Sequence, residues 1–217
     1  MALLTLFYSP GACSLVPHIA LREAGADFTT HRVLLANGDQ LRPDFLAVNP
    51  KARVPALRRN DNGEVLTEGV AILDWIVRTW PGAPLLPTDP WQRAKAMEAL
   101  VWLSGTVHGE MFASIFRPAR FVADTAIQPL LRDNGLTRLR QSFGDLDARL
   151  TGRDWLVDER FSLPDLYLFV LYRWGKRAQL PMHTDWPQVR ALVQRVRERP
   201  TVQAALAEEG LDPADFD

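Results

Sequence analysis

Cysteine is almost absent from this sequence of 217 residues, in which Cys13 is the single example. One cysteine cannot form an intramolecular disulfide framework, a Cys-x-x-Cys redox pair or a multi-cysteine metal site. We therefore expect no bound metal. We also expect an intracellular protein of a reducing compartment, the cytoplasm.

Lysine is nearly as scarce, and arginine supplies most of the positive charge. The chain has 25 basic and 26 acidic residues and a formal net charge of −1. A near-neutral chain without a basic run lacks the electrostatic footprint of a nucleic-acid-binding protein. We therefore expect no nucleic-acid partner.

Long apolar runs are missing too, since no stretch approaches the roughly 20 residues of a membrane-spanning helix. The first 13 residues are apolar and superficially like a lipoprotein signal. No Lys or Arg precedes Arg22, however, and Ser9-Pro10-Gly11 breaks the apolar run. We predict a buried strand and a turn here, and no membrane association.

The first 80 residues alternate the signals of strands and helices. A right-handed crossover between the first two strands would make them parallel. Asn60-Asp61-Asn62-Gly63 indicates a hairpin turn between the last two. The predicted strands are Leu3–Tyr8, Phe28–Leu35, Val54–Leu57 and Val65–Leu66; the predicted helices are Cys13–Ala24 and Glu68–Trp80, with at most a short irregular helix at Pro43–Val48.

Residues 81–90 contain four prolines and no helical period, as is typical of a linker. After this segment the sequence shows helical periodicity alone. Ser162 and Asp165, with Pro164 in the first turn, form the clearest helix start. We predict domains at 1–80 and 91–217 joined by a linker at 81–90, and helices near 91–117, 124–151, 162–178, 186–198 and 200–209.

Cys13 follows a strand and a Pro-Gly turn, at the expected start of the first helix. Backbone N–H groups and the positive end of the helix dipole favour a thiolate at such a position. A nucleophile or a mixed-disulfide site is one interpretation, and a small core residue is the other. Ser14 and Tyr8 are neighbouring hydroxyl donors that could instead hydrogen-bond a bound thiolate.

Arg53-Val54-Pro55 lies at the start of the third predicted strand. A cis bond before Pro55 would expose the backbone N–H and C=O of Val54 to an extended, peptide-like ligand. A trans proline at a strand edge is the more common arrangement, and the residues alone favour it.

Thr67-Glu68-Gly69 lies between a strand and the next helix. A helix N-terminus binds carboxylates, and the Glu68 side chain could accept a hydrogen bond from an ammonium group. A bound amino acid would carry both groups, the carboxylate and the ammonium. A simple helix cap by Thr67 fits the same residues equally well.

Six segments from both halves of the chain belong together in this argument: Tyr8–Leu15, Pro17–Glu23, Asp44–Lys51, Val54–Leu57, Leu66–Ile72 and Phe161–Asp165. In their residues and in their closely matching spacing, they resemble the glutathione S-transferase family, most closely its bacterial beta class. The resemblance covers nearly the whole chain. It implies an α+β, thioredoxin-like N-terminal domain of order βαβ–ββα, which holds glutathione, and an all-α C-terminal domain, which shapes the site for the second substrate.

The resemblance also implies roles for single residues. Cys13 would lie beside the glutathione sulfur and form a mixed disulfide with it. Val54, before a cis Pro55, would pair with the cysteinyl backbone, and Glu68 and Gly69 would hold the γ-glutamyl end. His108 would project from the helical domain toward the thiol, although from the residues alone it could equally be a structural imidazole.

Two departures from the beta-class pattern stand out. The loop Leu35–Gln40 lacks the lysine that beta enzymes often direct at the glycyl carboxylate, which leaves Lys51 and Arg53 as candidates for that role. Val101 and Thr106 stand where beta enzymes often carry polar or acidic groups that reach the partner subunit's glutathione.

The resulting prediction is a cytoplasmic glutathione transferase, a homodimer that uses glutathione as co-substrate and no prosthetic group. It would conjugate hydrophobic electrophiles, with disulfide or peroxide reduction through Cys13 as a further reaction. The rivals are a non-catalytic ligand- or partner-binding protein and a specialised dehalogenase or isomerase. The second-substrate pocket would come from a segment in which several residues also suit core packing: Met111, Phe112, Ile115, Phe116 and Phe121.

Overall fold

The computed structural model describes residues 2–217, and the chain divides into two compact units. The first contains the residues up to Leu86 together with Glu198–Pro213, and the second contains Pro87–Arg197 together with Ala214–Asp217. Residues 198–213 fall within the predicted helical domain 91–217, whereas the structure groups them with the first unit.

The first unit is built on a four-stranded sheet of order β2-β1-β3-β4. β1 runs parallel to β2 and antiparallel to β3, and β3 is antiparallel to β4. This is the predicted βαβ–ββα order. The strands are β1 (Leu4–Tyr8), β2 (Phe28–Arg32), β3 (Ala56–Arg59) and β4 (Val65–Thr67).

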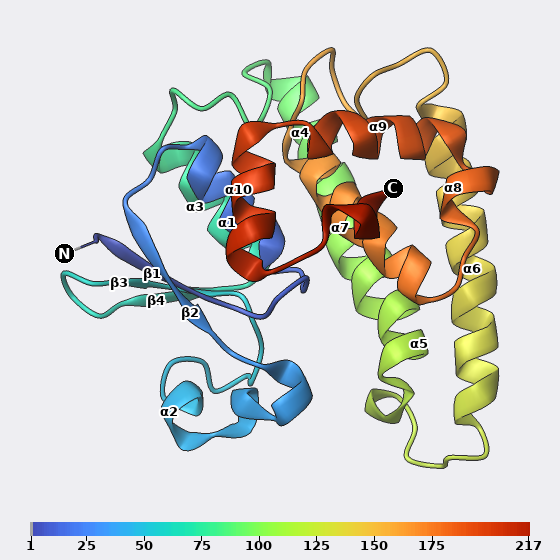
Figure 1. The fold of residues 1–217 in the computed structure, drawn as a ribbon, viewed down its shortest axis with the longest axis horizontal. Coiled ribbons are helices and arrows are strands. Elements are labelled where there is room, and N and C mark those ends of the chain that lie inside the picture. The colour runs from blue at the N-terminus through green and yellow to red at the C-terminus, as the bar shows by residue number, and fades with distance from the viewer. Residues whose placement is uncertain (1) are drawn as a thin grey trace. The chain divides into compact units, whose positions relative to one another are not determined.

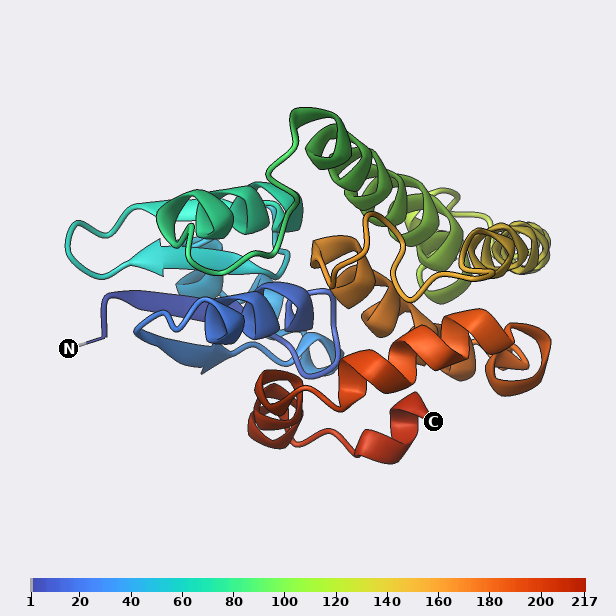
Figure 2. The ribbon, with the colours of Figure 1, turned by 90° about the horizontal axis from the view of Figure 1, so that it is seen from above.

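Helices cover both faces of this sheet (Figures 1 and 2). α1 (Leu15–Glu23) and α3 (Gly69–Thr79) lie side by side on one face, and the short α2 (Pro43–Leu46) lies on the other. All five residues of β1 are buried, as a central strand between two layers requires. Phe45 of α2 packs against Phe7 and Val54 in the core of the second face. The 3₁₀ turns η1 (Leu35–Asn37) and η2 (Asp39–Leu41) precede α2.

The last helix of the chain, α10 (Pro200–Glu209), lies along α1 in the same unit (Figure 1). At one end, the guanidinium of Arg199 donates two hydrogen bonds, of 2.7 and 2.8 Å, to the carboxylate of Glu23 on α1. Thr201 also donates to Glu23. Burial opposes ionisation of Glu23, but these hydrogen bonds outweigh it and hold the pKa of its carboxyl below the ordinary value.

The second unit is helical, and α7 lies at its centre. Eleven residues of α7 are buried, among them Leu168, Phe169 and Leu171. The ring of Phe216 stacks on Phe169 with centroids 4.1 Å apart. The elements are α4 (Pro90–Val101), η3 (Trp102–Phe112), α5 (Ala113–Phe116), η4 (Pro118–Arg120), α6 (Gln128–Arg149), α7 (Leu163–Arg177), α8 (Met182–Asp185), α9 (Pro187–Arg197) and the turn η5 (Pro213–Phe216).

The helix start at Ser162 is the one that the sequence predicts. Ser162 and Asp165 form a reciprocal capping box at the N-terminus of α7, in which the Ser162 backbone N–H donates to the Asp165 carboxylate at 2.8 Å. The predicted helix 91–117 is a continuous helical run, but its middle part, η3, is a π-helix. π-Helical segments occur frequently at functional sites.

Several predicted boundaries are corrected by the structure. β2 ends at Arg32, not at Leu35, because the chain turns into η1 there. β3 begins at Ala56, not at Val54, since Pro55 has no N–H to give to a ladder. The predicted helix from 124 begins at Gln128, with Pro129 in its first turn, and the short α8 was not predicted.

Candidate glutathione site

The loop Ser9–Ser14 carries Cys13 between β1 and α1. Ser14 closes the base of this loop, since its Oγ accepts the Ser9 N–H at 3.1 Å and donates to the Ser9 carbonyl at 3.3 Å. The Ala12 N–H donates to the same carbonyl. The Ser14 side chain is fully buried, so the structure places its hydroxyl inside the loop and not at the surface beside the thiol.

Cys13 is half-buried, and its Sγ donates to the backbone carbonyl of Val54 at 3.5 Å. α1 begins at Leu15, two residues later than predicted. The amides of Leu15 and Val16 donate back to the carbonyls of Ala12 and Cys13, so these two N–H groups are engaged within the turn. The positive end of the α1 dipole faces this loop, and it favours negative charge there.

The peptide bond between Val54 and Pro55 is cis, as the family resemblance implies, although the residues alone favour trans. A buried asparagine, Asn49, holds the segment before it. Asn49 Nδ2 donates to the Arg53 carbonyl at 2.6 Å, and Oδ1 accepts the Lys51 N–H at 3.1 Å. This role of Asn49 was not predicted, and the signal for it is the preference of asparagine for hydrogen-bonding nearby loop backbone.

Glu68 occupies the N-cap position of α3, with φ of 71°, in the left-handed region that non-glycine residues seldom adopt. Gly69 opens the helix and lies against the proline ring, because a Cβ placed on it would be 3.9 Å from Pro55 Cγ. Thr67 is the last residue of β4 and not the cap of the helix. Cys13, Val54, Pro55, Glu68 and Gly69 thus come together at one end of the sheet.

Lys51 lies at the same end of the sheet, where its side chain binds Glu68 and Thr67. Its Nζ lies 2.6 Å from Glu68 Oε1 and 2.9 Å from Thr67 Oγ1, and the Lys51 and Glu68 side chains are both exposed. The structure therefore brings Lys51 to the carboxylate expected to hold an ammonium group. Arg53, two residues beyond Lys51 in the sequence, is exposed to solvent.

Tyr8 is buried at the end of β1, with its ring 5.7 Å from that of His18. Burial raises the pKa of the Tyr8 phenol, and the carboxylates of Glu209 and Glu208 raise it further. The hydroxyl therefore stays protonated at neutral pH and can serve as a hydrogen-bond donor. No role was predicted for His18 or for these two carboxylates, which lie about 190 residues away from His18 along the chain.

His108 lies in η3 of the second unit and is partly buried. Its Nδ1 is 2.9 Å from the hydroxyl of Tyr167 on α7, and its ring meets that of Trp174 edge-on, with centroids 4.8 Å apart. Of the residues expected to shape the second-substrate pocket, Met111 and Phe112 are buried, Ile115 is partly buried, and Phe116 and Phe121 are exposed.

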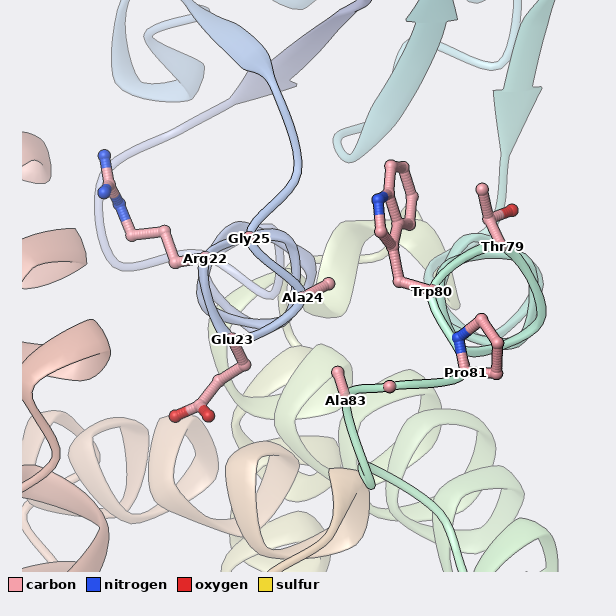
Figure 3. A pocket seen from close by; sticks show the side chains of 9 residues that line it. Arg22, Glu23, Ala24, Gly25, Thr79, Trp80, Pro81 and Ala83 are labelled. Carbon is pink, nitrogen blue, oxygen red and sulfur yellow. The ribbon is translucent and has the colours of Figure 1, made fainter.

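A pocket of 430 Å³ in the first unit lies between the C-terminal ends of α1 and α3 (Figure 3). Trp80 lines it, whereas the charged ends of Arg22 and Glu23 turn away toward α10, where they bind Glu208 and Arg199. No predicted site residue lines this pocket, and it lacks the converging polar groups of a specific ligand site.

Comparisons with known proteins bear on the family and on the fold of the chain. The family profiles described as the N-terminal and C-terminal domains of glutathione S-transferase match residues 11–79 and 117–200. Glutathione S-transferase GstA of Escherichia coli O157:H7 is 39% identical over 95% of this chain and 98% of its own length. The chain belongs to the glutathione S-transferase family.

Solved structures of glutathione transferases match over the whole fold. A homologue from Sulfitobacter, crystallised with bound glutathione, has a TM-score of 0.90 and 32% identity and covers 98% of this chain and 100% of its own. The beta-class enzyme of Sphingomonas chungbukensis has a TM-score of 0.83 and 38% identity, over 96% of this chain and 100% of its own. The predicted family, fold class and enzyme type are confirmed.

Two further findings describe the transferase chain itself. Within residues 2–217, no helix has the length and apolar character needed to cross a membrane. In the same residues, no three His, Cys, Asp or Glu side chains are grouped so that they could hold a metal ion.

Proposed function

We propose that this transferase binds glutathione along the end of the sheet formed by the loop Ser9–Ser14, Val54-Pro55 and the start of α3. The observation that carries the proposal is the 3.5 Å contact between Cys13 Sγ and the Val54 carbonyl, next to the cis proline. Glutathione's cysteinyl residue would pair with the Val54 backbone, which would bring its sulfur beside Cys13.

The charged groups at the two ends of glutathione would bind groups of opposite charge or polarity around this point. Its γ-glutamyl ammonium group would bind the Glu68 carboxylate, and its γ-glutamyl carboxylate would bind the N-terminal amides of α3 from Gly69. Lys51 pairs with Glu68 in this structure, which leaves Arg53 as the better candidate for the glycyl carboxylate.

The chemical step would be nucleophilic substitution by the glutathione thiolate. A carbon–sulfur bond forms at the electrophilic carbon, the bond to the halide or other leaving group breaks, and the thiol proton passes to solvent. The protein contributes orientation and thiolate stabilisation. The candidates for stabilising the thiolate are the dipole of α1, the protonated Tyr8 hydroxyl and the imidazole of His108. Ser14 supports the loop from within.

A second reaction through Cys13 follows from its position. A mixed disulfide of glutathione and a substrate thiol would be the oxidant: the Cys13 thiolate would attack its glutathione sulfur, release the substrate as thiolate and form a Cys13–glutathione mixed disulfide. A glutathione thiolate would then attack this mixed disulfide, release the Cys13 thiolate and form glutathione disulfide. The substrate disulfide is thereby reduced, and two glutathione units are joined as the oxidised product. The half-buried thiol at the start of α1 suits this exchange, since the thiolate is the reacting form.

The second substrate would be a small hydrophobic electrophile, and the exposed rings of Phe116 and Phe121 in the helical unit support this class. We also propose a cytoplasmic homodimer. Trp91 and Val101 on α4 have exposed fractions of 72% and 56%, and a second copy would cover such apolar surface.

Calorimetric titration with glutathione, followed by a spectrophotometric assay with a chlorodinitrobenzene, tests the proposal. We expect saturable binding and glutathione-dependent conjugation. Binding without turnover on any of a panel of halides, epoxides and maleyl compounds would favour a non-catalytic binding protein. Turnover of a single compound would favour the specialised dehalogenase or isomerase.

A further inference from the structure

Glu209, the last residue of α10, places a carboxylate in the interior of the first unit. Its side chain is fully buried, and its two oxygens have different partners. Oε1 lies 2.9 Å from Nδ1 of the buried His18 on α1, and Oε2 accepts the backbone N–H of Gly11 at 2.8 Å. One carboxylate thus joins the C-terminal helix, the first helix and the loop that carries Cys13.

Local helix physics does not favour this residue at this place. The last turn of a helix has a partial negative charge, which disfavours carboxylates there, and a carboxylate without hydrogen bonds is costly to bury. Glu209 is tolerated because His18 and Gly11 satisfy its oxygens. The Glu209 side chain therefore stabilises the loop and α1, and it does not stabilise α10, the helix that carries it.

The loop is restrained on two sides. Ser14 closes its base through both backbone polar groups of Ser9, and Glu209 accepts the amide N–H of Gly11. Gly11 has φ of 65°, a conformation that glycine adopts without strain. Cys13 lies two residues beyond Gly11, and its Sγ reaches the Val54 carbonyl from this restrained loop.

We propose that Glu209 is a positioning residue for Cys13, which acts through the amide of Gly11 and sets the place of the thiol beside Val54. The inference rests on the proposed reactivity of Cys13. Glu209 acts on the loop geometry, and it touches neither the thiol nor the substrate.

The adjacent residue, Glu208, provides a matched control. Its carboxylate lies 2.9 Å from the other ring nitrogen of His18 and accepts from Arg22, but its side chain has an exposed fraction of 42%. Glu208 and Glu209 therefore bind the same imidazole from neighbouring positions, and Glu209 also accepts a hydrogen bond from the Cys13 loop.

Two substitutions separate the position of Glu209 from its charge. Glu209→Gln keeps a side-chain oxygen at the length needed to accept the Gly11 N–H but removes the charge. Glu209→Asp keeps the charge but shortens the side chain by one methylene, which withdraws the carboxylate from Gly11. The titratable groups around the carboxylate are His18 on α1, which bonds to it, Tyr8 on β1 and Glu208 on α10, and all three are unchanged in both variants.

The readout is the rate of Cys13 alkylation by iodoacetamide as a function of pH, measured on the full chain without glutathione. For Glu209→Asp we expect an alkylation rate at pH 7 that is lower by about three- to tenfold, with the pH midpoint shifted upward, because the thiolate loses its place at the start of α1. Glu209→Gln and Glu208→Gln should stay within about twofold of the parent.

Amide hydrogen exchange of residues 9–14 gives a second measurement, and we expect faster exchange in Glu209→Asp than in Glu208→Gln. A Glu209→Asp variant with the parent's melting temperature, alkylation profile and loop exchange would overturn the proposal. So would a Glu209→Gln variant that behaves like Glu209→Asp. Failure of glutathione binding in the parent protein would instead contradict the proposed function, because alkylation needs no glutathione.

Discussion

The ammonium nitrogen of Lys51 lies 2.6 Å from a carboxylate oxygen of Glu68, and both side chains are exposed to solvent. Glu68 is the group proposed to hold the ammonium of glutathione, so Lys51 and the ligand would compete for it. An exposed ion pair of this kind contributes about 0.2–1 kcal/mol. The pair is therefore weak enough for the ligand to displace it.

Substitutions at these two positions should change glutathione affinity in opposite directions. Glu68→Gln should weaken binding by about 1.5–3 kcal/mol, because a hydrogen bond between charged groups is lost. Lys51→Met should strengthen binding by about two- to fivefold, since the competitor is removed. Isothermal titration calorimetry measures both. A tenfold weakening in Lys51→Met would mean that Lys51 itself contacts glutathione.

The two proposed reactions should respond differently to Cys13→Ser. Glutathione disulfide should add one glutathione to the parent chain, reversibly with dithiothreitol, and no adduct should form on the variant. Conjugation of an aromatic halide should persist in Cys13→Ser within about tenfold, because the attacking sulfur there belongs to glutathione. Mass spectrometry and the halide assay check the two parts. A parent chain without an adduct would make Cys13 a packing residue.

The imidazole of His108 should matter to conjugation more than to folding. His108→Ala should lower kcat by about tenfold to a thousandfold, the range for loss of a donor to developing negative charge. Tyr167→Phe removes the hydroxyl 2.9 Å from His108 Nδ1. It should therefore shift the pH profile of kcat, and it should lower kcat by less than His108→Ala does. Stopped-flow assays and thermal melts measure both. A His108→Ala protein that melts early but keeps its kcat would identify a structural histidine.

Local pattern was sufficient to predict the four strands and the helices α1 and α3 of the first unit, apart from their exact ends. The apolar run of β1, the turn at Asn60–Gly63 and the helical spacing after Gly69 can each be recognised within a short segment, and so can the capping box at Ser162 in the second unit. The π-helical form of η3 was not predicted, because a helical apolar pattern does not separate one extra residue per turn from ordinary α-helix.

Contacts between distant segments were the part that sequence could not supply. Cys13 and Val54 are 41 positions apart, and no local segment encodes the contact between them. Glu209 and Gly11 are 198 positions apart, and a glutamate at the end of a helix looks like an exposed residue when it is considered alone. Its burial is decided by the packing of α10 on α1, which no local pattern encodes.

The carboxyl group of Asp165 is buried at the start of α7 and should make stability depend on pH. Burial raises its pKa to about 7, even though the backbone amides of Leu156 and Ser162 and the Ser162 hydroxyl donate to it and act in the opposite direction. The ordinary value is 3.8. Between these two values the folded chain holds a proton that the unfolded chain releases.

The sign of the effect follows from this difference in proton binding. The contribution of Asp165 to stability is complete below pH 3.8 and is lost as the pH rises through about 7. The free energy of unfolding should therefore rise as the pH falls from 8 to 5, by at most about 1.4 kcal/mol per pH unit from this group. Asp165→Asn should be less stable and should lack this component, whereas Asp145→Asn, at an exposed position on α6, should keep it.

Urea unfolding at a series of pH values, followed by tryptophan fluorescence, measures the slope of the unfolding free energy against pH for each protein. Equal slopes in the parent and in Asp165→Asn would show that Asp165 remains ionised in the folded protein, held by its three donors.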